Sequence, residues 1–196
     1  MQYEEVYIKK SKMKFAVYCS SRQGLDNEYI ELAHALGQWI GSHGHTLVYG
    51  GVNAGLMHEI AQACHDAGGH ITGVNIEAFK HRTDPLVDEV IYTANLGERK
   101  ARMYQMADAF IVLPGGLGTV DEWIATLSQL VVDCDHQRQI VIVNLHDMYG
   151  SLMQYLNELA QSPFARDAHL QRLLVVDNAQ QMIECLNQIS SKNNEK

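Results

Sequence analysis

Short runs of β-branched and other apolar residues alternate with longer helical patterns along the chain from Lys14 onward. Apolar runs bounded by glycine or polar residues predict strands at 14–19, 46–51, 70–76, 90–93, 109–113, 139–144 and 173–176. Between most of these strands, apolar positions repeat at helical spacing. They predict helices at 27–42, 55–67, 97–107, 119–131, 148–160 and 178–189. We expect a loop at 77–87.

This alternation of strands and helices predicts an α/β fold. Specifically, we expect a Rossmann-like, doubly wound parallel sheet in a three-layer α/β/α arrangement. Right-handed crossovers then place the ligand crevice at the carboxyl ends of the strands. The 196 residues suffice for a single domain. We expect that domain to span 14–190, with 1–13 a flexible N-terminal extension and 191–196 a flexible tail.

Three turns rich in glycine or serine follow predicted strands and therefore face the same edge of the sheet. They read SSRQG at 20–24, GGVNAGLM at 50–57 and PGGLGTVDE at 114–122. The third turn is the most informative, because it leads from a buried strand directly into a helix. A helix start of this kind offers free N–H groups and a favourable dipole to an anion such as phosphate.

Within that third turn, we expect Gly115, Gly116 and Gly118 to adopt positive φ and let the backbone approach a ligand closely. Thr119 is expected to open the helix. The same residues also match a capping box from Thr119 to Glu122, which would give Glu122 a purely structural role. Both interpretations remain open from the sequence.

Helical spacing separates Glu122 from the apolar side of its helix. The apolar stripe consists of Val120, Trp123, Ile124, Leu127 and Leu130. Glu122 belongs instead to a polar stripe with Thr119, Thr126 and Gln129, and it falls in the first turn, beside the glycines. A carboxylate there would repel a phosphate bound at the loop unless the ligand separates them, and a ribose would do so.

The preceding helix carries a charge on an apolar face. Arg99 shares that face with Leu96, Met103 and Met106. Because an unpaired charge there is costly, Arg99 requires a carboxylate or an anionic ligand as its partner. Alternatively, Arg99 reaches solvent or pairs with Glu98 or Asp88. Helical periodicity alone predicts that the Lys100 side chain is exposed to solvent.

Composition narrows the class of protein. The net charge of −8 argues against nucleic acid or an anionic membrane as a partner. The 4 cysteines are widely spaced, and the N-terminus carries charges where a signal peptide needs an apolar stretch. The 10 histidines form no set with metal-ligand spacing, so we expect no metal. These features predict a cytoplasmic protein.

The segments ERKARM at 98–103 and ADAFIVLPGGLGTVDE at 107–122 resemble the LOG (Lonely Guy) family of cytokinin-activating phosphoribohydrolases. Members have often been labelled "possible lysine decarboxylase". The resemblance covers about 14–190, since VYCSS and YGGVNAGLM match the first two turns. It implies a usually dimeric, cofactor-free enzyme that cleaves nucleoside 5′-monophosphates, such as AMP, into free base and ribose 5-phosphate.

The resemblance also assigns roles to matching residues. Arg99 and Glu122 would be the catalytic pair, and the phosphate and ribose would be bound by Gly115, Gly116, Gly118, Thr119, Ser21 and Lys100. Glu122 would then face an oxocarbenium-like ribose, kept ionised by its place at a helix N-terminus. Asp121 points about 100° away on the helix and ranks lower. No residue is assigned as proton donor to the leaving base.

The sequence departs from the family pattern at several positions. Val52 and His58 stand where the family usually has glycine, and Ser20 stands in a turn that commonly reads C-G-S. These changes put the preferred base in doubt more than the reaction. A non-catalytic nucleotide or cofactor carrier of the same fold is the alternative function.

Two further expectations concern chemistry and assembly. Lysine decarboxylation is excluded, because pyridoxal phosphate needs a Schiff-base lysine with a supporting constellation, and neither Lys80 nor Lys100 has one. We also expect a homodimer. The helix at 55–67 is apolar on more than one face, and a second apolar side could be buried against another subunit.

Overall fold

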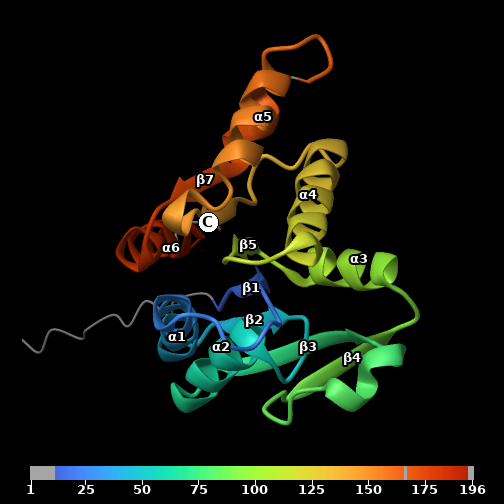
Figure 1. Cartoon of the computed structure of the whole chain (residues 1–196), viewed down its shortest axis with the longest axis vertical. Coiled ribbons are helices and arrows are strands. Elements are labelled where there is room, and N and C mark those ends of the chain that lie inside the picture. Colours follow the sequence, from blue (N-terminus) through green and yellow to red (C-terminus); the bar gives the residue numbers. More distant parts are fainter. Residues whose placement is uncertain (1–11, 166, 194–196) are drawn as a thin grey trace, which may run out of the picture.

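A single seven-stranded parallel sheet forms the centre of the chain (Figure 1). The structure is a computed structural model that describes residues 12–165 and 167–193. The strand order is β4-β3-β2-β1-β5-β6-β7, and every neighbouring pair is parallel. The strands are β1 (Lys14–Tyr18), β2 (Thr46–Tyr49), β3 (His70–Ile76), β4 (Glu89–Thr93), β5 (Ala109–Val112), β6 (Ile140–Val143) and β7 (Leu173–Val176). This confirms the predicted doubly wound α/β fold.

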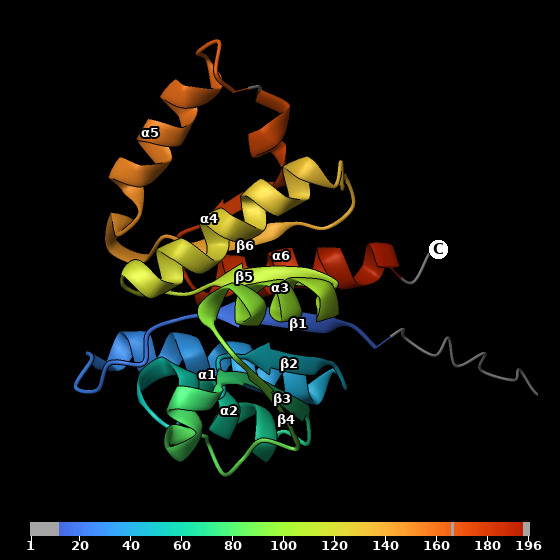
Figure 2. The ribbon, with the colours of Figure 1, turned by 90° about the vertical axis from the view of Figure 1, so that its right-hand side faces the viewer.

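Helices cover both faces of this sheet (Figures 1 and 2). One face packs against α1 (Asn27–Ser42), α2 (Gly55–Asp66) and α6 (Ala179–Asn193). The other packs against α3 (Leu96–Met106), α4 (Leu117–Val132) and α5 (Gly150–Ala160). Three short 3₁₀ helices lie at η1 (Glu77–Arg82), η2 (Leu145–Asp147) and η3 (Asp167–Arg172). The result is the expected three-layer arrangement.

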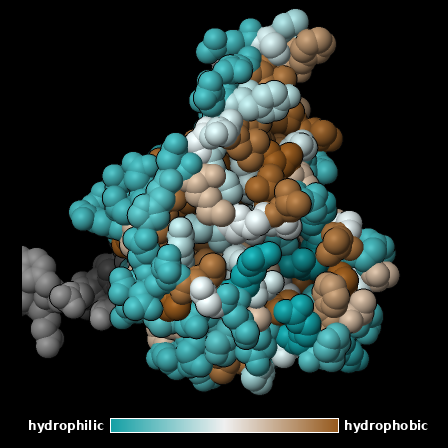
Figure 3. All heavy atoms as spheres, viewed as in Figure 1, coloured by the Kyte–Doolittle hydropathy of each residue, from teal (hydrophilic) through white to brown (hydrophobic). Residues whose placement is uncertain are grey.

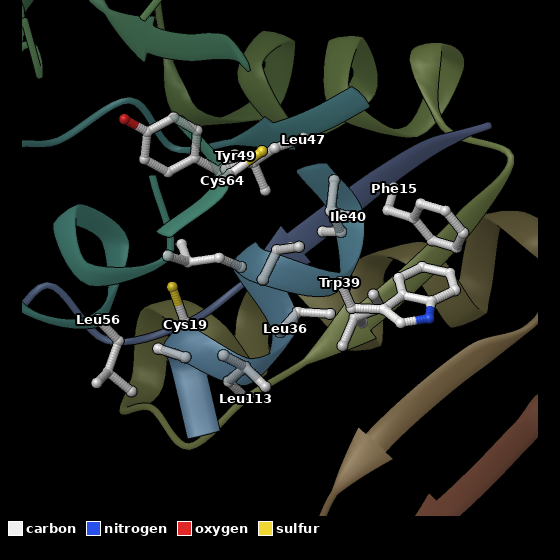
Figure 4. Packing of buried hydrophobic residues seen from close by; sticks show 14 of the residues in the cluster. Phe15, Cys19, Leu36, Trp39, Ile40, Leu47, Tyr49, Leu56, Cys64 and Leu113 are labelled. Atoms are coloured by element: carbon white, nitrogen blue, oxygen red, sulfur yellow. The ribbon is translucent and has the colours of Figure 1, made fainter. Parts of the chain in front are cut away.

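Successive residues of β1 serve the two faces in turn. Phe15 and Val17 belong to the cluster beneath α1, α2 and α6, whereas Ala16 and Tyr18 belong to the opposite cluster. Because both faces are covered, the strand is buried from Phe15 to Tyr18 and does not alternate with exposed polar residues after the exposed Lys14. Figure 4 shows the first cluster, in which the rings of Phe15 and Trp39 meet edge to face with centroids 5.4 Å apart.

The second apolar side of α2 is covered within the same chain. A Cβ atom at Gly37 of α1 would lie 2.4 Å from the carbonyl oxygen of Ile60 and 2.8 Å from the Cβ atom of Ala63. A Cβ atom at Gly41 would lie 2.6 Å from the carbonyl oxygen of Cys64. Glycines thus let α1 approach α2 closely, so α1 covers a second apolar side of α2 within this chain.

Some element ends differ from those predicted. The segment 77–87, expected as a loop, contains η1, and α6 continues through Asn193, past the expected end at 189. Residues 191–193 are therefore helical instead of a flexible tail. Met13 is buried and its N–H group bonds to His45 Nδ1, so the packed domain begins at least one residue before Lys14. The rest of the predicted extension and tail, 1–11 and 194–196, lies outside the described residues.

Candidate active site

The strand order brings the three glycine- or serine-containing turns together. Because β1 lies between β2 and β5, the chain reverses its direction of winding at this point, where doubly wound sheets bind ligands. The backbone N–H of Ser20 donates to the carbonyl of Pro114 at 3.2 Å. The backbone N–H of Met57 donates to the carbonyl of Ser20 at 3.3 Å. The turn after β1 therefore connects the other two.

Arg99 and Glu122 form an ion pair at this edge. Arg99 Nη2 lies 2.9 Å from Glu122 Oε1, and the two side chains are only 13% and 6% exposed. Arg99 Nε also donates to the carbonyl of Val74 at 2.9 Å. The expectation that Arg99 requires a carboxylate or an anion is thus met by Glu122, and neither Glu98 nor Asp88 takes that place.

Glycine at position 50 makes room for this pair. A Cβ atom there would lie 2.3 Å from Arg99 Nη2 and 3.0 Å from Met57 Sδ. The guanidinium group therefore lies directly against the backbone at the carboxyl end of β2. Any larger residue at Gly50 would displace it.

The capping-box interpretation of Glu122 is wrong. The helix α4 begins at Leu117, two residues before the expected start, with Gly116 as its N-cap and, within the described chain, no side chain capping it. Glu122 consequently lies in the second turn, and its carboxylate is engaged with Arg99. Side-chain caps occur instead on α3, where Asn95 Oδ1 accepts from the N–H of Glu98, and on α6, where Asn178 Oδ1 accepts from the N–H of Gln181.

The glycines of the third turn do not adopt positive φ, and among them only Gly115 is needed for space. In the described residues, glycines with positive φ are Gly24, Gly44, Gly51, Gly55 and Gly68, so the expectation for the third turn is wrong. Gly116 has φ of −89°. A Cβ atom at Gly115 would lie 2.1 Å from Thr119 Oγ1, so the buried Thr119 side chain packs over Gly115.

The start of α4 is open to a ligand. None of the described atoms lies within 4 Å of a Cβ atom built at Gly116 or Gly118, and both residues are exposed. The first hydrogen bond of the helix runs from the N–H of Val120 to the carbonyl of Gly116 at 3.0 Å. The N–H groups of the preceding first-turn residues therefore lack helical acceptors. This opening suits an anion.

Lys100 and Ser21 flank the pair in different ways. Lys100 Nζ lies 2.6 Å and 2.8 Å from the two carboxylate oxygens of Asp121, so α3 and α4 are joined by two adjacent ion pairs. Lys100 is therefore a paired residue and not a freely solvated one. Ser21 is half-buried in the turn after β1, and a Cβ atom at Gly55 would lie 2.6 Å from its carbonyl carbon.

Burial dominates the electrostatics of Glu122. Loss of hydration raises the pKa of its carboxyl, the Arg99 charge opposes this, Asp121 adds to the rise, and Lys100 again opposes it. We expected the helix N-terminus to keep Glu122 ionised, but Glu122 lies in the second turn of α4. The group that favours its ionised form is instead the guanidinium of Arg99. Burial likewise raises the pKa of Cys19, which holds it as an inert thiol.

Two contacts around the crevice were not predicted from the sequence. The buried Tyr149 donates its hydroxyl to the carbonyl of Leu113 at 2.9 Å, beneath the third turn. His58 Nδ1 lies 2.9 Å from Oδ2 of Asp84, whose side chain is 0% exposed. The contact of His58 could have been suspected, because histidine stands there in place of the family's usual glycine. Nothing in the sequence around Tyr149 indicated its bond to Leu113.

Both departures from the family's glycines touch one segment. Val52 forms an isolated antiparallel bridge with Thr83, and His58 pairs with the next residue, Asp84. The segment after η1 is thereby attached to the turn between β2 and α2. Val52 makes its contact through the main chain and His58 through its side chain, and neither contact involves Arg99 or Glu122.

Across 12–165 and 167–193, no three histidine, cysteine, aspartate or glutamate residues are grouped so that they could hold a metal ion. None of the helices in those ranges has both the length and the apolar character that a bilayer crossing requires.

Some known proteins are similar to this chain in sequence, and others are similar in fold. The family model described as "Possible lysine decarboxylase" matches residues 57–186. Cytokinin riboside 5′-monophosphate phosphoribohydrolase LOG4 of Arabidopsis thaliana is 32% identical, covering 97% of this chain and 89% of that protein. The enzyme named cytokinin riboside 5′-monophosphate phosphoribohydrolase in Mycobacterium marinum is 36% identical, covering 83% and 87%.

Solved structures agree on the fold. The molybdenum cofactor binding protein of Rippkaea orientalis superimposes with a TM-score of 0.72 at 22% identity, over 91% of this chain and 98% of that one. At that identity the likeness concerns the fold alone. The family match and the relatives' near full-length coverage show that this chain belongs to the LOG family.

Proposed function

We propose that the protein hydrolyses the N-glycosidic bond of a nucleoside 5′-monophosphate. The products are ribose 5-phosphate and a free base, either adenine or an N6-modified adenine. The observation that carries this proposal is the buried Arg99–Glu122 ion pair beside an unobstructed helix start. The names of the LOG relatives support a phosphoribohydrolase.

The substrate would span the crevice from the third turn toward Arg99. Its phosphate accepts hydrogen bonds from the backbone at Gly116, Gly118 and Thr119, where the helix dipole favours negative charge. The ribose then separates the phosphate from the carboxylate of Glu122. Ser21 in the neighbouring turn and Lys100 on α3 border the same ligand.

Glu122 and Arg99 would divide the chemistry between them. As the bond from C1′ to the base breaks, positive charge develops on the ribose, and the Glu122 carboxylate stabilises it or orients the attacking water. The water oxygen joins C1′ and the base leaves with a proton. Arg99 holds Glu122 ionised and in place, and its other N–H groups remain for ribose hydroxyls or phosphate.

The chemistry of the lysines argues against a lysine decarboxylase despite the description of the family model. Lys100 Nζ is paired with Asp121, and Lys80 Nζ stands 4.8 Å from the centroid of the Tyr92 ring. A pyridoxal phosphate enzyme needs a lysine amine free to form a Schiff base, together with a partner for the ring nitrogen. Neither lysine is placed in that way.

Base release measured on matched variants tests the proposal. Glu122→Gln keeps the size of the side chain and removes its charge, and we expect turnover of AMP to fall about 10²-fold or more. Asp121→Asn makes the same change on the next residue, which is 54% exposed, and should keep turnover near wild type. Released base is measured by chromatography across a nucleotide panel, with thermal melting as a fold control.

Two results would count against the proposal. Equal turnover by Glu122→Gln and the wild type would refute the catalytic role of Glu122. A wild type that binds nucleotides and releases no base would favour the alternative, a nucleotide or cofactor carrier.

We further propose that the protein is a homodimer. Its family is usually dimeric, and hydrophobic side chains gather between α4 and α5 on the face seen in Figure 3. Large apolar residues exposed on or beside these helices include Leu117 at 89%, Met148 at 47% and Tyr155 at 58%. Exposed apolar surface of this kind marks interaction sites. Light scattering at micromolar concentration should report twice the chain mass of 22.0 kDa, and a monomer would refute the proposal.

A further inference from the structure

The loop that precedes α4 is held from two sides by hydrogen bonds. On the β1 side, the N–H of Leu113 donates to the carbonyl of Tyr18 at 3.0 Å, and the carbonyl of Pro114 accepts from Ser20 at 3.2 Å. On the opposite side, Tyr149 donates its hydroxyl to the carbonyl of Leu113 at 2.9 Å. Tyr149 is therefore the side chain that fixes the loop from the direction of α5.

Tyr149 is itself rigidly placed. Its backbone N–H donates to Asn144 Oδ1 at 2.7 Å, and Asn144 Nδ2 donates to Asp147 Oδ1 at 3.0 Å. Its ring meets the ring of Trp123, the neighbour of Glu122, edge to face with centroids 6.3 Å apart. The side chain is thus fixed at its backbone, its ring and its hydroxyl.

The turn that presents Tyr149 is unusual and is tied to α1. His146 and Asp147 adopt φ of 54° and 56°, conformations that disfavour residues other than glycine. His146 pairs with Glu28 of α1, and its ring lies 6.2 Å from that of Tyr29. A strained conformation persists where its surroundings determine it strongly. Contacts from α1 and from Asn144, the residue after β6, therefore hold the turn that places the Tyr149 hydroxyl.

We propose that Tyr149 is a positioning residue for the phosphate-binding loop. It acts through Leu113, holding the main chain so that the N–H groups at the start of α4 keep a fixed place. The anion's identity rests on the proposed function; the anchoring rests on the contacts above. Because Leu113 is 0% exposed, its carbonyl has no access to solvent when the hydroxyl is removed. Burial raises the pKa of Tyr149, so the phenol stays protonated and able to donate.

Tyr149→Phe removes this hydroxyl and keeps the ring contact with Trp123. We expect affinity for ribose 5-phosphate, measured by calorimetry, to fall about tenfold, since a hydrogen bond that orders the site is lost. The KM for AMP should rise by a similar factor, with kcat within about threefold of wild type, because ground-state and transition-state binding are lost together. Tyr104→Phe is the matched control: the Tyr104 hydroxyl donates to Asp133 Oδ2 at 2.6 Å, at the end of α4 opposite Gly116, so neither quantity should change.

A second variant tests whether Tyr149 acts through its own anchor. Asn144→Ala removes the acceptor of the Tyr149 N–H and should weaken ribose 5-phosphate binding in the same direction. Combined with Tyr149→Phe, it should add little, because both changes release the same loop. Full additivity of the two effects would overturn the proposed route.

Hydrogen exchange separates this inference from the proposed function. Without any ligand, the amides at 113–119 should exchange faster in Tyr149→Phe than in the wild type or Tyr104→Phe. Unchanged exchange and unchanged ribose 5-phosphate affinity would overturn the positioning role. A wild type that binds ribose 5-phosphate but releases no base would overturn the proposed function and leave this inference standing.

Discussion

The turn after β2 and the turn after β5 both contain three glycines, but their glycines serve different purposes. In the turn after β2, a Cβ atom at Gly50 would lie 2.3 Å from Arg99 Nη2, and one at Gly55 would lie 2.3 Å from the carbonyl oxygen of Arg22. Gly55 also has φ of +55°. In the turn after β5, Cβ atoms at Gly116 and Gly118 would meet none of the described atoms within 4 Å.

This difference separates glycines that the fold requires from glycines that it does not. The turn after β2 is filled by the chain itself, so its glycines permit folding and the placement of Arg99. The outer glycines of the turn after β5 meet no packing or positive-φ requirement, which agrees with the close approach of a ligand that we propose there. A glycine-rich motif alone makes no such distinction.

Gly55→Ala should produce the largest change and should act on stability. The new Cβ atom meets the backbone of Ser21 and Arg22 and also strains a left-handed residue, so we expect a loss of about 2–5 kcal/mol in the free energy of unfolding. Gly24→Ala is the control, because Gly24 has φ of +72° with none of the described atoms nearby. Urea denaturation should show a much smaller loss for it. Equal losses of unfolding free energy in Gly55→Ala and Gly24→Ala would mean that the structure relaxes to relieve the clash at Gly55.

Gly50→Ala should act on catalysis more than on folding. The atoms it would meet are the ends of two flexible side chains, Arg99 and Met57, which can move aside. Displacing the Arg99 guanidinium disturbs Glu122, and a misplacement of about 1 Å costs on the order of 10²-fold in kcat. Affinity for ribose 5-phosphate should stay within about threefold, because the start of α4 is untouched. A normal kcat would show that the pair tolerates displacement.

Gly118→Ala should change stability and binding in opposite directions. Gly118 lies in the first turn of α4 and is exposed, so alanine should raise the free energy of unfolding by about 0.5–1 kcal/mol. The added methyl group obstructs the anion, and ribose 5-phosphate should bind about tenfold more weakly or worse. Unchanged affinity for ribose 5-phosphate, measured by calorimetry, would show that the phosphate binds away from this turn.

The smallest effect is expected in the pH profile of kcat/KM. Because burial raises the pKa of Glu122, activity that requires its carboxylate should fall with decreasing pH at a value above the ordinary 4.5. Lys100→Gln removes a charge that lowers this pKa, so the acid limb should move to higher pH. Asp121→Asn removes a charge that raises it, so the limb should move to lower pH. Shifts of the same sign in both variants would assign the limb to another group.

Local patterns determined the parts of the fold that the sequence predicted well. The strand at 70–76 and the helix at 27–42 have the predicted bounds, because their apolar positions follow a single period. The start of α4 was placed late, because Leu117 stands between Gly116 and Gly118, and glycine has a low helix propensity. The last turn of α6 was missed because it depends on Ser190, whose hydroxyl lies 3.3 Å from Nε2 of the distant His45.

The site was predictable as a set of unusual residues but not as a set of contacts. A charge on the apolar face of α3 indicated that Arg99 requires a partner, and the structure places Glu122 there. Choosing between Glu122 and the nearer carboxylates required the strand order. The buried environment of Glu122 and the anchor at Tyr149 both depend on elements distant in sequence, and a periodic pattern contains no information about them.

The turn after β1 has a consequence for how this enzyme could diverge. Its two connections, to Pro114 and to Met57, are both made by the main-chain N–H and carbonyl of Ser20. A backbone contact is largely insensitive to the side chain that the residue carries. Position 20 can therefore exchange a small residue such as glycine for serine while neighbouring turns keep their spacing. The side chain that lines the crevice at position 20 can thus change while the main-chain contacts that hold the turns, and the Arg99–Glu122 ion pair, stay as they are.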